Sequence, residues 1–209
     1  MHRKPVILAL DLEGVLVPEI WIAVSEHTDI PELRLTTRDV PDYGVLMKRR
    51  LAILRQHHLT LKDIQGVIKE VEPLPGASAF LQWARSMLQV IVLSDTFYEF
   101  AKPLMKKLKY PTLFCNSLQI DEGGRIGDYH LRQKDGKRKA VLAFQRLDFE
   151  VISVGDSYND TTMLAASEMG ILFRPPDTVK REFSQFSVCT DYAQLTAHIE
   201  EYLQKGRKK

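Results

Sequence analysis

Residues 5–14 read PVILALDLEG, an uninterrupted aliphatic run that ends in a carboxylate at Asp11. Such a run is typical of a parallel strand buried on both faces, and the polar residues after it are typical of the loop at its carboxyl end. The same pattern recurs in VIVLSDT at 90–96 and in VISVGDS at 151–157. We therefore expect three central strands, each ending in polar side chains.

Helical periodicity separates these strands. It predicts helices over 77–88, 98–108, 137–147, 160–168 and 191–203, and further short strands fit 112–115, 171–173 and 188–190. This alternation predicts an α/β fold, a Rossmann-like doubly wound sheet that is mostly parallel and has helices on both faces.

Two segments depart from simple alternation of strand and helix. Residues 17–73 carry apolar residues at helical spacing over 21–27, 43–57 and 61–71, and we expect them to form a small helical cap domain on a catalytic core of 1–16 and 74–209. Residues 116–132 alternate around Asp-Glu-Gly-Gly and predict a β-hairpin flap. Because the cap leaves the core after the first strand, it should lie over the edge where open α/β sheets bind ligands.

The overall composition is that of an ordinary globular protein. The 209 residues are 44% hydrophobic and 27% charged, and a net charge of +2 indicates neither a nucleic-acid nor a membrane partner. Cys115 and Cys189 have no metal-ligand spacing, and no apolar stretch is long enough to cross a membrane, so we expect a cytoplasmic protein. The oligomeric state is not indicated.

The predicted strand ends bring oxygen-rich side chains to one rim of the sheet. They are Asp11 and Glu13, Ser94 and Asp95, and Asp156 and Asp160. Crowded carboxylates favour a hard cation such as Mg²⁺, and a lysine at the same rim, from among Lys134, Lys137 and Lys139, would bind an anion. Together these groups predict a phosphoryl-transfer site. The motifs of P-loop, dinucleotide-binding and HExxH zinc proteins are absent from the sequence.

The same residues resemble the four motifs of the haloacid dehalogenase-like superfamily. The match rests on DLEGVLVPEIW at 11–21, TTRD at 36–39, SDTFYEF at 94–100, LRQKD at 131–135 and GDSYNDTTML at 155–164. More narrowly, the chain resembles the phosphoserine phosphatase branch, and within it the bifunctional enzymes that also transfer the phosphoryl group from phosphoserine to homoserine.

The resemblance implies a role for each matching residue. Asp11 would be the nucleophile that becomes an aspartyl phosphate, and Glu13 the general acid and base. Mg²⁺ would be held by the carboxylates of Asp11 and Asp156 and the backbone carbonyl of Glu13, with Asp160 holding a metal-bound water or the lysine. Ser94 and Lys137 would grip the phosphoryl oxygens. Lys137 is preferred to Lys134 because it opens the helix before the Asp156 strand.

The resemblance also implies how the amino acid is recognised. Glu19 would bind the substrate ammonium and Arg50 its carboxylate, with Met47 one turn away lining the same pocket. Asp95 is either a helix cap or a substrate contact, and Asn159 either a turn residue or a group that binds substrate or orients Asp156. For Trp21 and Tyr43, packing inside the cap is favoured over contact with a ligand.

Glu13 departs from the pattern of the superfamily, in which most phosphatases carry Asp at this position. The side chain is one methylene longer, and the resemblance implies that the intermediate partitions between water and an amino-alcohol acceptor such as homoserine. Two other readings stay open: another phosphatase of the superfamily, such as an enolase-phosphatase, and a catalytically silent binding module.

Overall fold

The computed structural model describes residues 4–37, 39–40 and 42–205, so Arg38, inside the 36–39 motif, and both ends of the predicted core lie outside the described residues. Within the described chain, seven strands form one sheet in the order β4-β3-β2-β1-β5-β6-β7. Their bounds are β1 Val6–Leu10, β2 Gln89–Phe97, β3 Thr112–Ile120, β4 Ile126–His130, β5 Glu150–Gly155, β6 Met169–Phe173 and β7 Ser187–Cys189. All neighbours pair in parallel except β3 and β4, which confirms the predicted α/β fold.

Helices cover both faces of the sheet. One face packs against α4 (Ala77–Met87), α5 (Tyr98–Lys107) and α9 (Tyr192–Lys205), and the other against α6 (Gly136–Arg146), α7 (Thr161–Ala166) and α8 (Asp177–Glu182). In β1, Leu8 and Leu10 face the first layer and Ala9 faces the second. The strand is apolar throughout because both of its faces are buried.

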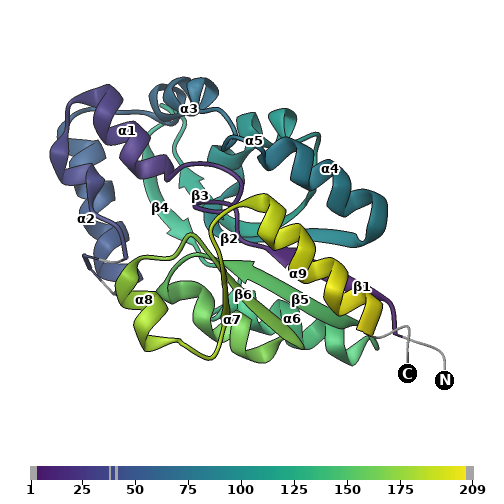
Figure 1. Cartoon of the computed structure of the whole chain (residues 1–209). Coiled ribbons are helices and arrows are strands. Elements are labelled where there is room, and N and C mark those ends of the chain that lie inside the picture. Colours follow the sequence, from purple (N-terminus) through teal and green to yellow (C-terminus); the bar gives the residue numbers. More distant parts are fainter. Residues whose placement is uncertain (1–3, 38, 41, 206–209) are drawn as a thin grey trace.

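A group of helices is inserted between β1 and α4. It consists of α1 (Ile20–Thr28), the 3₁₀ turn η1 (Pro31–Arg34), α2 (Tyr43–Gln56) and α3 (Leu61–Glu70), and we call it the inserted helices. Figure 1 shows α1 and α2 away from the end of the sheet where β1 begins and α9 ends. Because β1 starts near the N-terminus, the inserted helices lie beyond the carboxyl ends of the strands.

The predicted hairpin is present as β3 and β4. The Asp121 side chain accepts hydrogen bonds from the backbone N–H groups of Gly123 and Arg125, at 2.9 and 2.8 Å, and Gly124 takes a positive φ of 76° to close the turn. The hairpin also reaches the inserted helices, because the Leu61 N–H donates to the Gly124 carbonyl at 2.9 Å.

Several boundaries differ from those predicted. Strand β2 continues through the polar SDT segment to Phe97, where it pairs with Asn116 after a shift in register. The helix expected over 160–168 is a 3₁₀ turn, η2 (Tyr158–Asp160), followed by the shorter α7. Helix α8 was not predicted, since its six residues are too few for a helical period to stand out.

No helix in the described part of the chain combines the length and the apolar character needed to cross a membrane.

Candidate active site

Asp11 lies directly after β1 and is almost fully buried. Its backbone N–H continues the sheet by donating to the Val154 carbonyl at 2.9 Å. Its Oδ1 accepts a hydrogen bond from the Leu12 N–H at 2.7 Å and lies 2.9 Å from the Lys137 Nζ. The end of the strand therefore fixes the orientation of this carboxylate.

Lys137 is the buried cation next to Asp11. It lies in the first turn of α6 and is 5% exposed, with its Nζ 2.7 Å from Asp160 Oδ1 and 3.6 Å from Asp95 Oδ2. Burial lowers its pKa, but the carboxylates around it outweigh burial and raise the pKa of Lys137 well above its usual range. Lys134 lines a wider groove outside the buried site, so the geometry favours Lys137 as the lysine next to Asp11.

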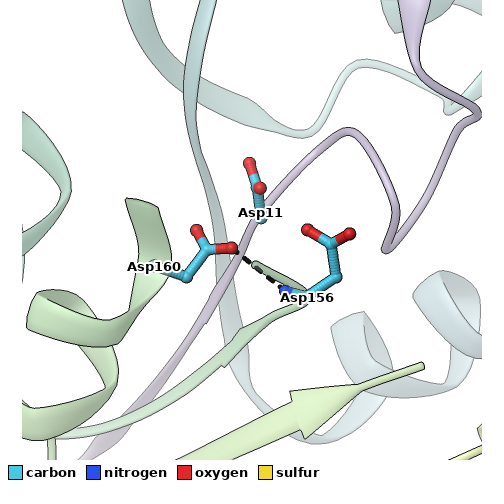
Figure 2. A group of neighbouring side chains, drawn as sticks. All are labelled: Asp11, Asp156 and Asp160. Carbon is cyan, nitrogen blue, oxygen red and sulfur yellow. Dashed lines mark hydrogen bonds between the residues drawn. The ribbon is translucent and has the colours of Figure 1, made fainter. Parts of the chain in front are cut away.

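Asp160 positions the loop after β5. Its Oδ2 accepts from the backbone N–H groups of Asp156 and Ser157, at 3.0 and 3.2 Å, while its Oδ1 holds Lys137. Figure 2 shows the bond from the Asp156 N–H and the three neighbouring aspartates. Two glycines allow this packing: a Cβ on Gly155 would lie 2.3 Å from the Asp160 Cβ, and one on Gly14 would lie 2.4 Å from Asp156 Oδ2.

The donor set fits a divalent cation. Carboxylate oxygens of Asp11, Asp156 and Asp160 lie within 4.8 Å of one another, and all three residues are buried. Burial, followed by the charge of Asp160, raises the pKa of Asp11, while Lys137 lowers it. One lysine balances one of the three negative charges, so a hard cation would stabilise the ionised forms. Both carboxylate oxygens of Asp160 have partners, Oδ1 in Lys137 and Oδ2 in the two backbone N–H groups.

Asp95 does not cap the helix after it. The N-terminal cap of α5 is Phe97, and the Asp95 carboxylate instead accepts from Asn159 Nδ2 at 2.9 Å and faces Lys137. The cap interpretation is wrong because β2 runs on to Phe97 and carries Asp95 into the rim of the site. Asn159 joins the same network, since its Oδ1 also accepts from the Ser157 hydroxyl at 2.5 Å.

A cavity of about 70 Å³ lies above these groups, between the sheet edge and the inserted helices. It brings together nine of the predicted site residues: Asp11, Glu13, Glu19, Arg50, Ser94, Asp95, Lys137, Asp156 and Asn159. Glu13 Oε2 accepts from the Ile20 N–H at 3.0 Å. Burial, with the nearby Glu19 carboxyl, raises the pKa of Glu13 to about 8.

Arg50 reaches the cavity from α2. Its guanidinium carbon lies 4.5 Å from the Trp21 ring centroid, and its Nη2 donates to the Leu35 carbonyl at 2.7 Å. Its Nε is buried and has no hydrogen-bond partner among the described residues. Burial lowers the pKa of Arg50 to about 10, which leaves it charged at neutral pH. Met47 was expected to line the pocket but lies behind Arg50, with its Sδ 3.8 Å from Nη1.

Sequence reasoning did not single out several cavity residues, which are Thr36, Thr37, Thr96, Phe97 and Ser157. All five lie inside the motifs TTRD, SDTFYEF and GDSYNDTTML, which held a signal for them. Trp21 and Tyr43 pack with the core as expected, and both also line the cavity.

The chain is similar to known proteins in sequence and in fold. The family model for haloacid dehalogenase-like hydrolases matches residues 7–168. A Pseudomonas syringae pv. tomato protein named phosphoserine phosphatase is 58% identical over 189 residues, covering 90% of this chain and 80% of that protein. A Pseudomonas aeruginosa protein named phosphoserine phosphatase ThrH is 57% identical, covering 90% of this chain and 92% of that protein. The solved structure of a substrate-bound phosphoserine phosphatase complex shares the fold, with a TM-score of 0.73 and 16% identity over 95% of this chain and 99% of that one.

Proposed function

The chain belongs to the haloacid dehalogenase-like hydrolase family, and we propose that it is a Mg²⁺-dependent phosphoserine phosphatase that works through a phosphoaspartyl intermediate on Asp11. One observation carries the proposal. A buried carboxylate, Asp11, is paired with a buried cation, Lys137, on the floor of a cavity whose other residues include Glu19 and Arg50. A phosphoamino acid offers matching groups: a phosphate for the floor, and an ammonium and a carboxylate for the other two residues.

In this proposal residues 17–73 act as a cap that recognises the amino acid. The Arg50 guanidinium would bind the substrate carboxylate, because its buried Nε–H has no hydrogen-bond acceptor among the described residues. Glu19 would bind the ammonium group. The bound amino acid would therefore contact one basic and one acidic side chain from residues 17–73.

The first chemical step forms the phosphoenzyme. Oδ1 of Asp11 is held by Leu12 and Lys137, so Oδ2 attacks phosphorus and forms a P–O bond as the bond to the serine oxygen breaks. The departing serine oxygen takes its proton from the Glu13 carboxyl group. Lys137 and Ser94 stabilise the charge on the phosphoryl oxygens, since phosphoryl transfer depends chiefly on positioning and charge neutralisation.

The second step reverses the proton movement. A water molecule gives a proton to the Glu13 carboxylate and attacks the phosphorus, and the bond to Asp11 breaks to release inorganic phosphate. An alcohol in place of water would give a new phosphomonoester by the same proton movement. We propose homoserine as such an acceptor, because Glu13 reaches further than the Asp usual in the superfamily and would meet an alcohol oxygen as well as water.

A bound Mg²⁺, held by Asp11, Asp156 and the Glu13 backbone carbonyl, would neutralise charge on the phosphoryl group. Removal of divalent cations with a chelator should therefore abolish turnover.

The test is ³¹P NMR of phosphoserine with the protein and Mg²⁺, run with and without homoserine. The proposal expects inorganic phosphate in both reactions and an added phosphohomoserine signal in the second. Release of phosphate without phosphohomoserine would contradict the proposed transfer to homoserine and leave the proposed phosphatase activity in place. No conversion of phosphoserine, with turnover of an enediol phosphate in a substrate panel, would favour an enolase-phosphatase.

A further inference from the structure

Tyr43 links the inserted helices to the phosphoryl end of the site. It is the first residue of α2, and its hydroxyl donates to the backbone carbonyl of Asp95, at the end of β2, over 2.8 Å. The two residues are 52 positions apart in sequence, so this bond joins two separate parts of the fold.

The Asp95 segment is held from several directions. Its carbonyl also accepts from Asn116 Nδ2 on β3 at 3.0 Å, and its carboxylate is held by Asn159 and faces Lys137. Ser94, the proposed phosphate-binding hydroxyl, is the neighbouring residue. The Tyr43 bond is therefore a direct connection from α2 to the backbone that carries Ser94.

The inserted helices are also attached on the α3 side. Gln65 Nε2 donates to the Glu99 carbonyl on α5 at 2.7 Å, and Lys107 on α5 donates to the Lys69 carbonyl at 2.7 Å. At the start of α2, the Tyr43 ring instead meets Tyr129 of the hairpin edge-on, with centroids 6.0 Å apart. The Tyr43 ring contacts Tyr129, and its hydroxyl adds a directional hydrogen bond from the start of α2 to Asp95.

Tyr43 also lies where the small cavity meets open space. It lines both the 70 Å³ cavity and a groove of about 700 Å³ that continues past Leu131 and Lys134. Tyr43 therefore stands at the boundary between the cavity and the groove, with its hydroxyl bonded to the Asp95 carbonyl.

We propose that Tyr43 is a positioning residue that couples closure of the inserted helices over the amino acid to the placement of the Ser94–Asp95 segment. Phosphoryl transfer is then fastest for a phosphomonoester whose amino and carboxyl groups hold the inserted helices closed. This inference rests on the proposed function and adds a determinant of its selectivity.

The experiment compares Tyr43→Phe with Tyr129→Phe, a matched control that removes a hydroxyl from the neighbouring ring and leaves the bond to Asp95. For each variant, kcat/KM is measured on phosphoserine and on p-nitrophenyl phosphate, a phosphomonoester without ammonium or carboxylate. Because one hydrogen bond is removed, the ratio of the two values should fall roughly 3–10-fold in Tyr43→Phe. It should keep its wild-type value in Tyr129→Phe.

An unchanged or increased ratio in Tyr43→Phe would overturn the inference, as would an equal fall in both variants. Urea unfolding of the two variants identifies any general loss of stability. Such a loss would lower kcat/KM for both substrates by the same factor and leave their ratio unchanged. Failure of the proposed function looks different, because the wild-type protein would then not hydrolyse phosphoserine at all.

Discussion

At the scale of single residues, Arg50 is the side chain that we propose binds the substrate carboxylate. Its guanidinium stacks on Trp21 and donates to Leu35, yet its buried Nε is unsatisfied within the described part of the chain. A buried donor without a partner costs about 1–3 kcal/mol, which a bound carboxylate would recover. The planar fork of Arg suits this geometry, and the point charge of Lys does not.

Arg50→Lys should therefore raise KM for phosphoserine by roughly 10–100-fold, the equivalent of one charge-assisted hydrogen bond, and change kcat much less. Steady-state kinetics checks this, with Arg49→Ala, an exposed neighbour on α2, as the control. A loss confined to kcat would show that Arg50 acts on the chemical step instead.

At the scale of elements, the turn after β5 depends on close approach of Asp160 to the backbone of Gly155. A methyl group at Gly155 would lie 2.3 Å from the Asp160 Cβ and push away the carboxylate that holds Lys137. We expect Gly155→Ala to lose about 1–3 kcal/mol of unfolding free energy and most of its activity.

Gly66, inside α3, is the matched control for Gly155, because a Cβ there meets nothing within 4 Å. Gly66→Ala should gain about 0.5–1 kcal/mol and keep its activity. Urea denaturation and phosphoserine turnover measure both variants. Equal stability changes at the two glycines would contradict the packing described here.

The start of α3 supplies a pH-dependent prediction. Thr60 donates from its hydroxyl and its backbone N–H to Asp63 Oδ2, at 2.7 and 2.8 Å, and these bonds lower the pKa of Asp63. A lowered pKa in the folded state means that the bonds add stability at neutral pH and that this stability is lost as pH falls through the lowered pKa.

Asp63→Ala should therefore be less stable than the wild type by about 0.5–1 kcal/mol at pH 7. Urea denaturation at pH 7 and below about pH 4 checks whether the difference shrinks in acid. A difference of the same size at both pH values would mean that the Asp63 charge contributes nothing.

At the scale of the whole molecule, the sequence predicted the sheet and the rim of the site because both depend on local signals. Buried parallel strands are apolar throughout, and the polar side chains that follow them lie at the same edge of the sheet. The sequence alone could therefore predict that Asp11, Ser94 and Asp156 lie close together. Lys137 could be chosen over Lys134 because it lies at the start of the helix before the Asp156 strand.

Other features depend on contacts between distant segments. The partners of Asp95 come from α2, β3 and the turn after β5, so nothing near residue 95 distinguishes a helix cap from a network of hydrogen bonds. The position of Met47 behind Arg50 likewise follows from packing against the core. Helical spacing alone placed it on the correct helix but not at the correct depth.

The two cysteines report on the integrity of the whole core. Both are buried and free, and burial raises the pKa of Cys115 to about 12 and that of Cys189 to about 11. The reactive thiolate is therefore scarce at pH 8. Ellman's reagent should label neither thiol rapidly in the native protein and both in denaturant. Immediate reaction of one native thiol would show that its part of the core is open.

The most direct test of the account is to locate the phosphoryl group during turnover. The reaction of the protein with phosphoserine and Mg²⁺ is stopped in acid within one turnover, and the peptides are analysed by mass spectrometry. A phosphoaspartyl mechanism predicts one added phosphoryl group on the peptide that contains Asp11, and neither this group nor turnover in Asp11→Asn. A phosphoryl group on another residue, or turnover by Asp11→Asn at the wild-type rate, would contradict it.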